Sequence, residues 1–326
     1  MNILIIHNSR IPVFKYGGIE RVIWVLGNEL VKKGHKVTYL VKKGAYCNFA
    51  PVIFINDKIP INSQIPKDID IAHIHFQPKE KIQIPHLVTM HGNLPPETSF
   101  FINTSYVSQN HAERYGADAF VYNGLDWDDY GFPDFNRKRN YVHFLGKAAW
   151  KIKNVKGAIK IAKENKTELK VLGGTRLNFK MGMRFTVTKW AKFYGMVGGT
   201  KKNELLKNSG ALIFPVLWHE PFGLAIIESL YFGCPVFGTK FGSLPELIND
   251  ETGFLSNSIQ ELIGGLKNHN LFDRKKCHEY AVSEFNSRLM AESYLKLYER
   301  ILNGEKINRN IPQYIPGKNS LEKYLA

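Results

Sequence analysis

The sequence is poor in cysteine and has no long apolar run. Its three cysteines, Cys47, Cys234 and Cys277, lack the spacing of metal ligands, and their odd number favours reduced thiols in a cytoplasm. No run of roughly 18 apolar residues occurs, so no transmembrane helix is expected. The first residues, MNILIIHNSR, lack the basic region and the small-residue cleavage site of a signal peptide, and they predict a buried strand. These absences favour a cytoplasmic protein.

Acidic residues are few relative to basic ones. The chain has 44 Lys and Arg against 29 Asp and Glu, a net charge of +15, which predicts an anionic partner. The excess lies in the second half, because residues 1–138 have 15 basic and 13 acidic residues and the rest has 29 and 16. We call residues 176–202 the basic tract: it contains no acid and seven cations, namely Arg176, Lys180, Arg184, Lys189, Lys192, Lys201 and Lys202.

The partner of the basic tract is open at this level. An anionic membrane, such as the inner face of the cytoplasmic membrane, or an anionic glycolipid would attract a polybasic surface. A solvated basic face without a partner is an equally good explanation. Nucleic acid is disfavoured, because no helix-turn-helix, RNP-type or zinc-finger pattern accompanies the charge.

The first half alternates short apolar segments with helical periodicity, which predicts a doubly wound parallel sheet. A strand at Asn2–His7 leads through Gly17 and Gly18 into a helix over Ile19–Lys33, and the glycines could let a diphosphate or an acceptor approach the backbone. This loop lacks the G-x-G-x-x-G spacing of a dinucleotide fold. Further strands are predicted at Val37–Val41, Val52–Ile55, Ile69–His75, His86–Met90, Phe101–Thr104 and Ala119–Val121.

Chain composition changes between residues 126 and 139. Asn123–Asp126 predicts a turn, and the following segment is rich in Asp, Gly, Pro and Arg with little apolar periodicity. We therefore predict a first domain over residues 1–138, a second over 139–303 and a tail over 304–326 that packs on the first domain or is mobile. Phe285–Leu302 has the periodicity of an amphipathic helix.

Lysines follow the first strand predicted for the second domain. Tyr141–Leu145 is a strand, and a loop after it holds Lys147, Lys151, Lys153 and Lys156. Cations at the end of a strand can neutralise charge that builds up on a leaving phosphate. Lys147 and Lys153 are the favoured pair, with Lys151 next.

Two carboxylates, Glu220 and Glu228, bracket a glycine turn. A buried strand at 211–216 precedes Pro221, Phe222 and Gly223, and the helix that begins near Gly223 and continues through Leu224 contains Glu228 and ends at Gly233. The free N–H groups and the dipole at such a helix start favour an anion. An ordinary βα unit with a solvated Glu remains the alternative for either carboxylate alone.

The segment LWHEPFGLAIIESLYFGCPVFGTKFGSLPEL resembles the Glu-x7-Glu signature of retaining glycosyltransferases of the glycogen-synthase-like family four. Similar segments elsewhere extend the resemblance to about nine-tenths of the chain. It implies an α/β protein of GT-B architecture, in which two Rossmann-like doubly wound domains face each other across a cleft. Two departures are Lys147, where the family usually has arginine, and Ser243, where it has a second glycine. Lysine in place of arginine loses a bidentate fork.

The resemblance implies a role for each matched position. Glu220 would bind the donor sugar near the reacting carbon, Lys147 and Lys153 would stabilise the diphosphate, and the His91 of Thr89–Gly92 would approach the donor sugar. Glu228 would accept hydrogen bonds from ribose hydroxyls. The other implied substrate-binding residues are Gly17, Gly18, Lys151, Met196, Val197, Pro221, Phe222, Gly223, Leu224 and Glu246.

The expected function is transfer of a hexosyl or N-acetylhexosaminyl group, with retention, from a UDP- or GDP-type sugar to a glycan or glycolipid in cell-surface polysaccharide or lipopolysaccharide biosynthesis. The acidic cluster Asp126–Asp129 falls in the predicted linker and is not interpreted as a metal motif, so neither a metal nor another cofactor is expected. The alternatives are a GT-B enzyme of another reaction type, such as a sugar-nucleotide epimerase or a phosphorolytic enzyme, and a catalytically silent nucleotide-sugar-binding or membrane-scaffold protein.

Overall fold

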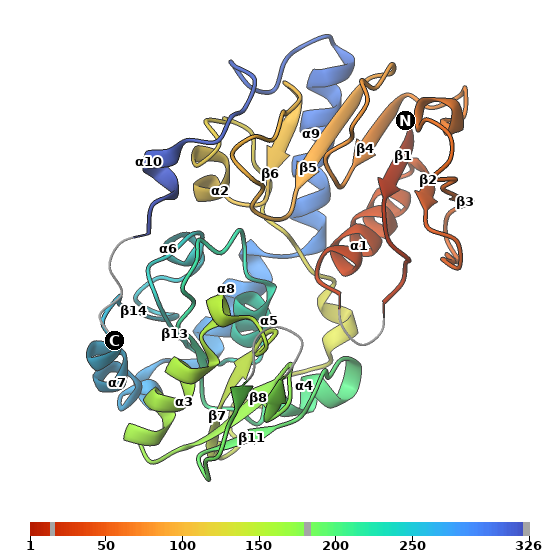
Figure 1. Ribbon diagram of the computed structural model, residues 1–326. Helices are drawn as coiled ribbons and strands as arrows, with labels where there is room; N and C mark the ends of the chain where they lie inside the picture. Colours follow the sequence, from red (N-terminus) through yellow and green to blue (C-terminus); the bar gives the residue numbers. More distant parts are fainter. Residues whose placement is uncertain (14–16, 179–183, 322–326) are drawn as a thin grey trace. The chain divides into compact units, whose positions relative to one another are not determined.

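The computed structural model describes residues 1–13, 17–178 and 184–321, so Tyr16 and Lys180 of the segments above lie outside the described residues. The chain forms two compact units (Figure 1). Unit 1 comprises Met1–Asp126 and Phe285–Asn319, and unit 2 comprises Trp127–Glu284 with the described residues from Ser320. In the described part of the chain, no helix has the length and apolar character needed to cross a bilayer.

Unit 1 is built on a six-stranded parallel sheet in the order β3-β2-β1-β4-β5-β6. Its strands are β1 (Asn2–His7), β2 (Lys36–Val41), β3 (Val52–Phe54), β4 (Ile71–Ile74), β5 (His86–Met90) and β6 (Thr104–Tyr106). Its helices are α1 (Ile19–Lys32), η1 (Asn62–Gln64), α2 (Gln109–Glu113), α9 (Ser287–Leu302) and α10 (Pro316–Asn319). The central strands are apolar and almost fully buried, as expected of a parallel sheet with both faces covered.

Unit 2 repeats this architecture with a parallel sheet in the order β11-β8-β7-β12-β13-β14. Its strands are β7 (Tyr141–Leu145), β8 (Glu168–Leu172), β11 (Ala191–Phe193), β12 (Leu212–Phe214), β13 (Val236–Gly238) and β14 (Gly253–Leu255). Its helices are η2 (Trp127–Tyr130), η3 (Lys151–Lys153), α3 (Val155–Glu164), α4 (Gly199–Lys207), α5 (Leu224–Tyr231), α6 (Leu244–Leu247), α7 (Ile259–Leu266), η4 (His269–Leu271) and α8 (Arg274–Glu284). The α/β class and the paired doubly wound sheets agree with the prediction.

The unit boundary differs from the predicted one. Unit 1 ends at Asp126, not at residue 138, and it regains the chain from Phe285, which the sequence placed in the second domain. Leu125 pairs with Asn286 as an isolated bridge, and α9 packs on α1 and β5. This packing buries the apolar face of α9, including Tyr298, whose hydroxyl lies 2.6 Å from His73 Nδ1 in β4.

The segment from Trp127 to Arg139 is structured and does not behave as a linker. Trp127 is buried in η2 and stacks on Tyr231 at a ring-centroid distance of 4.5 Å. Arg139 is also buried, and its guanidinium donates to the carbonyls of Phe232 and Ser209 at 2.7 and 2.8 Å. The polar composition of the segment concealed these aromatic and arginine anchors.

Three local predictions in unit 1 were wrong. The strand predicted at Phe101–Thr104 begins only at Thr104, and Ala119–Val121 contributes a single bridge, at Phe120. Asn123–Asp126 does not form a turn. Gly124 is needed there for close approach, because a Cβ would lie 2.1 Å from the Asn286 carbonyl oxygen.

The tail after α9 belongs to unit 1 up to Asn319. Asn308 is buried, and its side-chain oxygen accepts from the backbone of Ala119 at 2.9 Å, while its amide donates to the carbonyl of Thr104 at 2.7 Å. The tail therefore caps the β6 end of the unit 1 sheet through side-chain hydrogen bonds, which a sequence pattern does not reveal.

Candidate active site

In unit 2, loops that follow neighbouring strands meet at the carboxyl edge of the sheet. The strand order places β8 on one side of β7 and β12 on the other, so β7 lies where the winding reverses, the usual ligand position in doubly wound sheets. Gly146 follows β7, Gly173 follows β8 and Gly195 follows β11. Gly173 has φ +126, and a Cβ there would lie 2.1 Å from the Gly146 carbonyl oxygen. Glycine thus lets these loops approach closely.

Lys153 and Glu220, both predicted as catalytic, form an ion pair at this edge. Lys153 Nζ lies 2.5 Å from Glu220 Oε2, and both side chains are largely buried, with 12% and 9% of their surface exposed. Trp218 Nε1 donates to the same carboxylate oxygen at 2.8 Å, and Lys153 Nζ lies 4.7 Å from the centre of the Trp218 ring. The carboxylate therefore has a fixed orientation, and sequence reasoning missed the contribution of Trp218.

Backbone contacts hold the two loops of this ion pair in register. Asn154 adopts a left-handed conformation, caps α3 by accepting from Gly157 N at 3.0 Å and donates to the Pro215 carbonyl at 2.9 Å. Leu217 N donates to the Ile152 carbonyl at 2.7 Å. The lysine loop after β7 is thereby tied to the loop after β12, which contains Glu220.

The turn before α5 is built by glycines, as predicted. Gly223 has φ +91 and precedes a helix whose first turn has no side-chain cap. Gly242 has φ +69 and forms a bridge with Glu220, where a Cβ would lie 2.3 Å from the Glu220 nitrogen. Ser243, which departs from the family pattern, donates to the Phe222 carbonyl at 2.6 Å. The start of α5 and Glu220 are thus fixed by one glycine-dependent loop pair.

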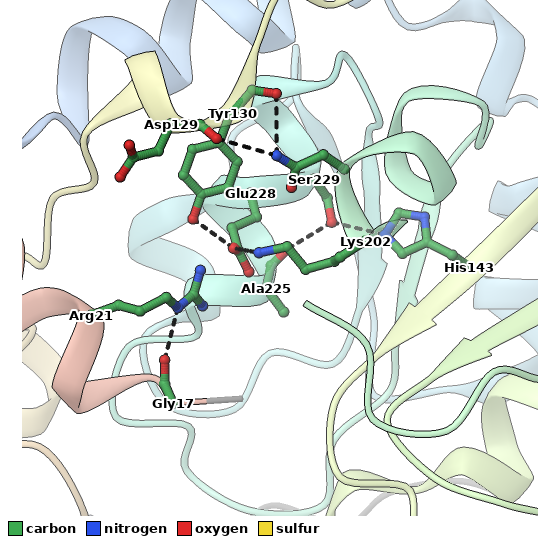
Figure 2. A network of polar contacts seen from close by, with 10 residues as sticks. Gly17, Arg21, Asp129, Tyr130, His143, Lys202, Ala225, Glu228 and Ser229 are labelled. Carbon is green, nitrogen blue, oxygen red and sulfur yellow. Dashed lines mark hydrogen bonds and ion pairs between the residues drawn. The ribbon is translucent and has the colours of Figure 1, made fainter. Parts of the chain in front are cut away.

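Glu228 lies in α5 inside a buried polar network (Figure 2). Its Oε1 is paired with Lys202 Nζ and accepts from the Tyr130 hydroxyl at 2.7 Å. Only 8% and 3% of the Lys202 and Glu228 side chains are exposed. Asn203, next to Lys202 in α4, donates to the Tyr130 carbonyl at 3.2 Å. A ribose-binding role for Glu228 stays a prediction, and a ribose hydroxyl would share this carboxylate with Lys202 and Tyr130.

Lys202 belongs to the basic tract in sequence, but in the structure it is buried and paired with Glu228, so it is not one of the solvated cations. The only sequence signal for its pairing is that a buried Glu in α5 requires a cation. The same network extends through Ser229, whose hydroxyl lies 2.9 Å from Nε2 of the buried His143. Burial lowers the pKa of His143 to about 3, so this histidine is a neutral structural group.

The remaining predicted residues of unit 2 differ in how closely they approach the ion pair. Lys147 Nζ lies 5.0 Å from the centre of the Trp150 ring, and Lys151 is exposed in η3. Pro221 and Phe222 are buried, and Leu224 is half-buried at the start of α5. Met196 and Val197 follow the end of β11, and Met196 is 41% exposed. Glu246 is half-buried in α6.

In unit 1, histidines gather at the carboxyl edge of the sheet. His7 ends β1, His73 and His75 lie in and just after β4, and His91 follows β5. The strand order makes β1 and β4 neighbours at the point where the winding reverses. His75 Nδ1 lies 2.9 Å from His91 Nε2, and the His73 and His75 rings are 4.0 Å apart. Sequence reasoning selected His91 and missed the neighbouring histidines, although His7 and His75 are visible at predicted strand ends.

Burial controls the charge of these histidines. It lowers the pKa of His91 to about 3, with His7 contributing to the shift, and it holds the pKa of His73 and of His75 well below the ordinary value. The cluster is therefore neutral near pH 7, and its members act as hydrogen-bonding groups, each with one N–H and one bare nitrogen.

The predicted glycine loop of unit 1, Gly17 and Gly18, is described from residue 17 onward. Gly17 is packed so closely that a Cβ would lie 2.3 Å from a Val13 methyl carbon, and its carbonyl accepts from Arg21 Nε at 2.7 Å (Figure 2). Gly18 precedes α1, and Glu20 in its first turn accepts from Ser9 at 3.0 Å. The substrate-binding role of this loop stays a prediction.

No metal site is evident among the described residues. Within residues 1–13, 17–178 and 184–321, no group of three His, Cys, Asp or Glu side chains is arranged to hold a metal ion. The expectation of a metal-independent reaction is therefore carried forward as a prediction.

Comparison with protein families places a known domain in unit 2. Residues 128–269 match the family described as glycosyl transferases group 1, a segment that includes Lys147, Lys153, Glu220 and Glu228. The N-acetyl-alpha-D-glucosaminyl L-malate synthase of Bacillus anthracis is 29% identical over 98 residues, which are 27% of this chain and 25% of that protein. The match thus spans about a quarter of that relative's length.

Solved structures resemble the chain over nearly its whole length. AviGT4, a glycosyltransferase involved in avilamycin A biosynthesis, is 20% identical, with 93% of this chain and 98% of that chain covered and a TM-score of 0.77. Sucrose-phosphate synthase from Thermosynechococcus elongatus is 14% identical, with 93% and 100% covered and a TM-score of 0.71. HepE of Anabaena, in complex with UDP-glucose, is 17% identical, with 93% and 99% covered and a TM-score of 0.62. The fold is GT-B, as predicted, and within it residues 128–269 are similar to the glycosyl transferases group 1 family.

Proposed function

We propose that the protein transfers a hexosyl or N-acetylhexosaminyl group from a UDP- or GDP-type sugar to a glycan or glycolipid, in cell-surface polysaccharide or lipopolysaccharide biosynthesis. The observation that carries the proposal is the buried Lys153–Glu220 ion pair beside the start of α5, within the segment that matches the glycosyl transferases group 1 family. In this proposal unit 2 binds the donor and unit 1 binds the acceptor.

The chemistry proposed for the donor relies on fixed charge. The uncapped first turn of α5 and the cations Lys147 and Lys153 would stabilise the diphosphate as it leaves, with Lys151 available at the rim. Glu220, held by Lys153 and Trp218, would accept hydrogen bonds from sugar hydroxyls. A pre-oriented carboxylate costs no reorganisation when the transition state forms.

We propose that the reaction proceeds with retention on one face of the sugar. The acceptor oxygen bonds to the anomeric carbon while the bond from that carbon to the phosphate oxygen breaks, and the acceptor proton passes to the leaving phosphate. Only Glu220 is assigned next to the reacting carbon, so the two-carboxylate scheme of retaining hydrolases is not required. Positioning and diphosphate stabilisation then supply the rate.

The first experiment identifies the donor. Thermal unfolding is measured with UDP-, GDP- and ADP-sugars, because a ligand that binds the folded state raises the apparent stability. The donor that raises Tm is then incubated with candidate acceptors, and the anomeric configuration of the product is read by NMR. Transfer with retention supports the proposal. Epimerised sugar indicates the epimerase alternative, and binding without turnover indicates the silent-protein alternative.

The metal-free proposal has its own test. Activity is expected to be unchanged by EDTA, since the charges assigned to diphosphate stabilisation belong to lysines and to the helix start. Loss of activity in EDTA that Mg²⁺ or Mn²⁺ restores would contradict it.

A further inference from the structure

A short antiparallel hairpin leaves the unit 2 sheet between β8 and β11. It consists of β9 (Leu177–Asn178) and β10 (Arg184–Phe185), with Phe185 opposite Leu177. The hairpin contains none of the residues predicted to be catalytic or substrate-binding. Because it joins two strands that are themselves neighbours in the parallel sheet, it is an addition to the doubly wound order.

The described residues of this hairpin present apolar side chains to solvent. Leu177 is 49% exposed, Phe185 68% and Val187 80%. Directly opposed residues of an antiparallel pair share one face, so Leu177 and Phe185 project from the same face. Val187 follows the end of β10 and is also exposed. Contiguous exposed apolar side chains in a soluble unit mark an interaction surface more often than isolated ones do.

The base of the hairpin is firmly attached, so the exposure is not caused by fraying. Arg176 donates to the carbonyls of Thr186 and Thr188 at 3.2 and 3.0 Å and to the Ala191 carbonyl at 2.7 Å. Exposed and half-buried residues alternate from Phe185 to Trp190, in the segment between β10 and β11. The apolar face is therefore presented by a fixed backbone.

Cations are concentrated in the same part of the chain, and the basic tract contains no acid to offset them. Lys189, on the same exposed side as Val187, places its Nζ 5.2 Å from the centre of the half-buried Trp190 ring. Lys192 and Lys201 are also exposed, whereas Lys202 is buried against Glu228. Exposed apolar side chains with lysine and tryptophan close by in the chain suit an anionic bilayer surface, which offers phosphates above an apolar interior.

We propose that this hairpin docks the protein on an anionic lipid surface, with Phe185 and Val187 entering the acyl boundary and Lys189 and Lys192 at the phosphates. Nucleic acid supplies phosphates but offers no comparable apolar layer for Phe185 and Val187. The proposal goes beyond charge attraction, because it assigns part of the binding to apolar insertion. It does not depend on glycosyl transfer, so the two proposals can fail separately.

Vesicle flotation of the full chain tests the proposal. The vesicles contain phosphatidylcholine with about one third phosphatidylglycerol, a charge density at which polybasic surfaces bind. The test variant is Phe185→Ser with Val187→Ser. The matched control is Phe132→Ser with Leu271→Ser, because those side chains are 90% and 82% exposed in the same unit and lie outside the hairpin.

The expected result is at least about a tenfold loss of vesicle binding in the hairpin variant. This magnitude follows from the loss of two apolar side chains that would be buried in the bilayer. The control variant is expected to bind like the wild type. Lys189→Gln with Lys192→Gln should also weaken vesicle binding. Of the two hairpin variants, this one alone should show a smaller salt dependence of binding than the wild type. Nucleotide-sugar binding, measured by thermal shift, should be unchanged in every variant.

Several outcomes would overturn the proposal. Wild-type flotation that is absent, equal with pure phosphatidylcholine, or unchanged in the hairpin variant would each do so. Sedimentation that shows a wild-type dimer and a monomeric hairpin variant would assign the face to a second copy of the chain. Binding of an acidic protein or a nucleic acid with the same sensitivity to Phe185 and Val187, without vesicle binding, would assign it to that partner.

Discussion

Lys153 and Glu220 are 67 residues apart in sequence, yet their side chains meet at 2.5 Å at the carboxyl edge of the unit 2 sheet. Trp218 completes the arrangement from the Glu220 side. A buried ion pair contributes little net stability to the folded protein, because desolvation of both charges opposes their attraction. Its position at a strand-end edge suits a ligand that needs both charges in fixed positions.

Replacement of Glu220 by Gln is expected to lower turnover by at least about a hundredfold, which is typical for removal of one electrostatic group from a reacting centre. Glutamine keeps the size of the side chain and loses its charge. The measurement is kcat with the identified donor and acceptor, alongside the thermal shift given by that donor. A variant that binds donor and retains near-wild-type turnover would remove Glu220 from the mechanism.

Lys147 provides a second test of diphosphate stabilisation. Lys147→Ala is expected to lower kcat by about a hundredfold through loss of a cation near the leaving group. Lys147→Arg should retain most of the activity, because it keeps the charge and adds a bidentate fork. Lys156→Ala, in the exposed part of the first turn of α3, is the control and should have little effect. Equal kcat in the Ala and Arg variants at position 147 would refute the assignment.

Much of the architecture could be predicted from sequence, because both sheets consist of short apolar segments separated by glycine turns. β1, β5 and β7 have the predicted bounds, and α5 is followed by Gly233, which has a positive φ and marks the predicted end of that helix. The site loop around Gly223 could also be predicted, since only glycine accepts its backbone conformation.

Long-range pairing could not be predicted in the same way. The contacts of Lys202 with Glu228, of Arg139 with Phe232 and of Tyr298 with His73 join residues far apart in sequence, and local periodicity does not encode them. The unit boundary was misplaced for this reason. A polar segment after Asp126 looked like a linker, although its Trp127 and Tyr130 are buried in unit 2.

The Lys202–Glu228 pair predicts a stability effect. Lys202→Met should lower the free energy of unfolding by about 3–5 kcal/mol, because it removes the lysine charge from a buried carboxylate. The neighbouring Lys201 is exposed, and Lys201→Met should change stability by less than about 0.5 kcal/mol. Chemical denaturation measures both. The double variant Lys202→Met with Glu228→Gln should recover part of the loss, and additive losses would show that the two groups are not coupled.

The histidine cluster predicts how stability depends on pH. The folded-state pKa values of His73, His75 and His91 lie below the unfolded value near 6.5, so below about pH 6.5 the unfolded chain binds more protons than the folded chain. Stability is therefore full above that pH and is lost as the pH falls. Each group contributes a slope of up to about 1.4 kcal/mol per pH unit.

The measurement is the free energy of unfolding between about pH 7.5 and 5, a window in which histidines titrate before most carboxyls. His91→Asn removes one of the groups and should reduce the slope. An unchanged slope in this variant would show that His91 does not contribute to the pH dependence.

The contact between His75 and His91 predicts which nitrogen of each ring carries the hydrogen. His75 Nε2 is buried and has no hydrogen-bond partner among the described residues. A buried N–H without an acceptor is rarer in proteins than an unsatisfied acceptor. The favoured arrangement therefore has the His75 hydrogen on Nδ1, donated to His91 Nε2 at 2.9 Å, and the His91 hydrogen on Nδ1.

His75 is thus assigned as a positioning residue for His91. His75→Ala should remove the donated hydrogen bond and lower kcat roughly five- to tenfold, the equivalent of about 1 kcal/mol, with a smaller effect on KM. His75→Asn should rescue much of this loss, because its amide can donate from nearly the same place as Nδ1. Nitrogen-15 NMR of the His91 ring reads the tautomer directly. A wild-type His91 with its hydrogen on Nε2, or a His75→Ala variant with unchanged His91 ring shifts, would contradict the assignment.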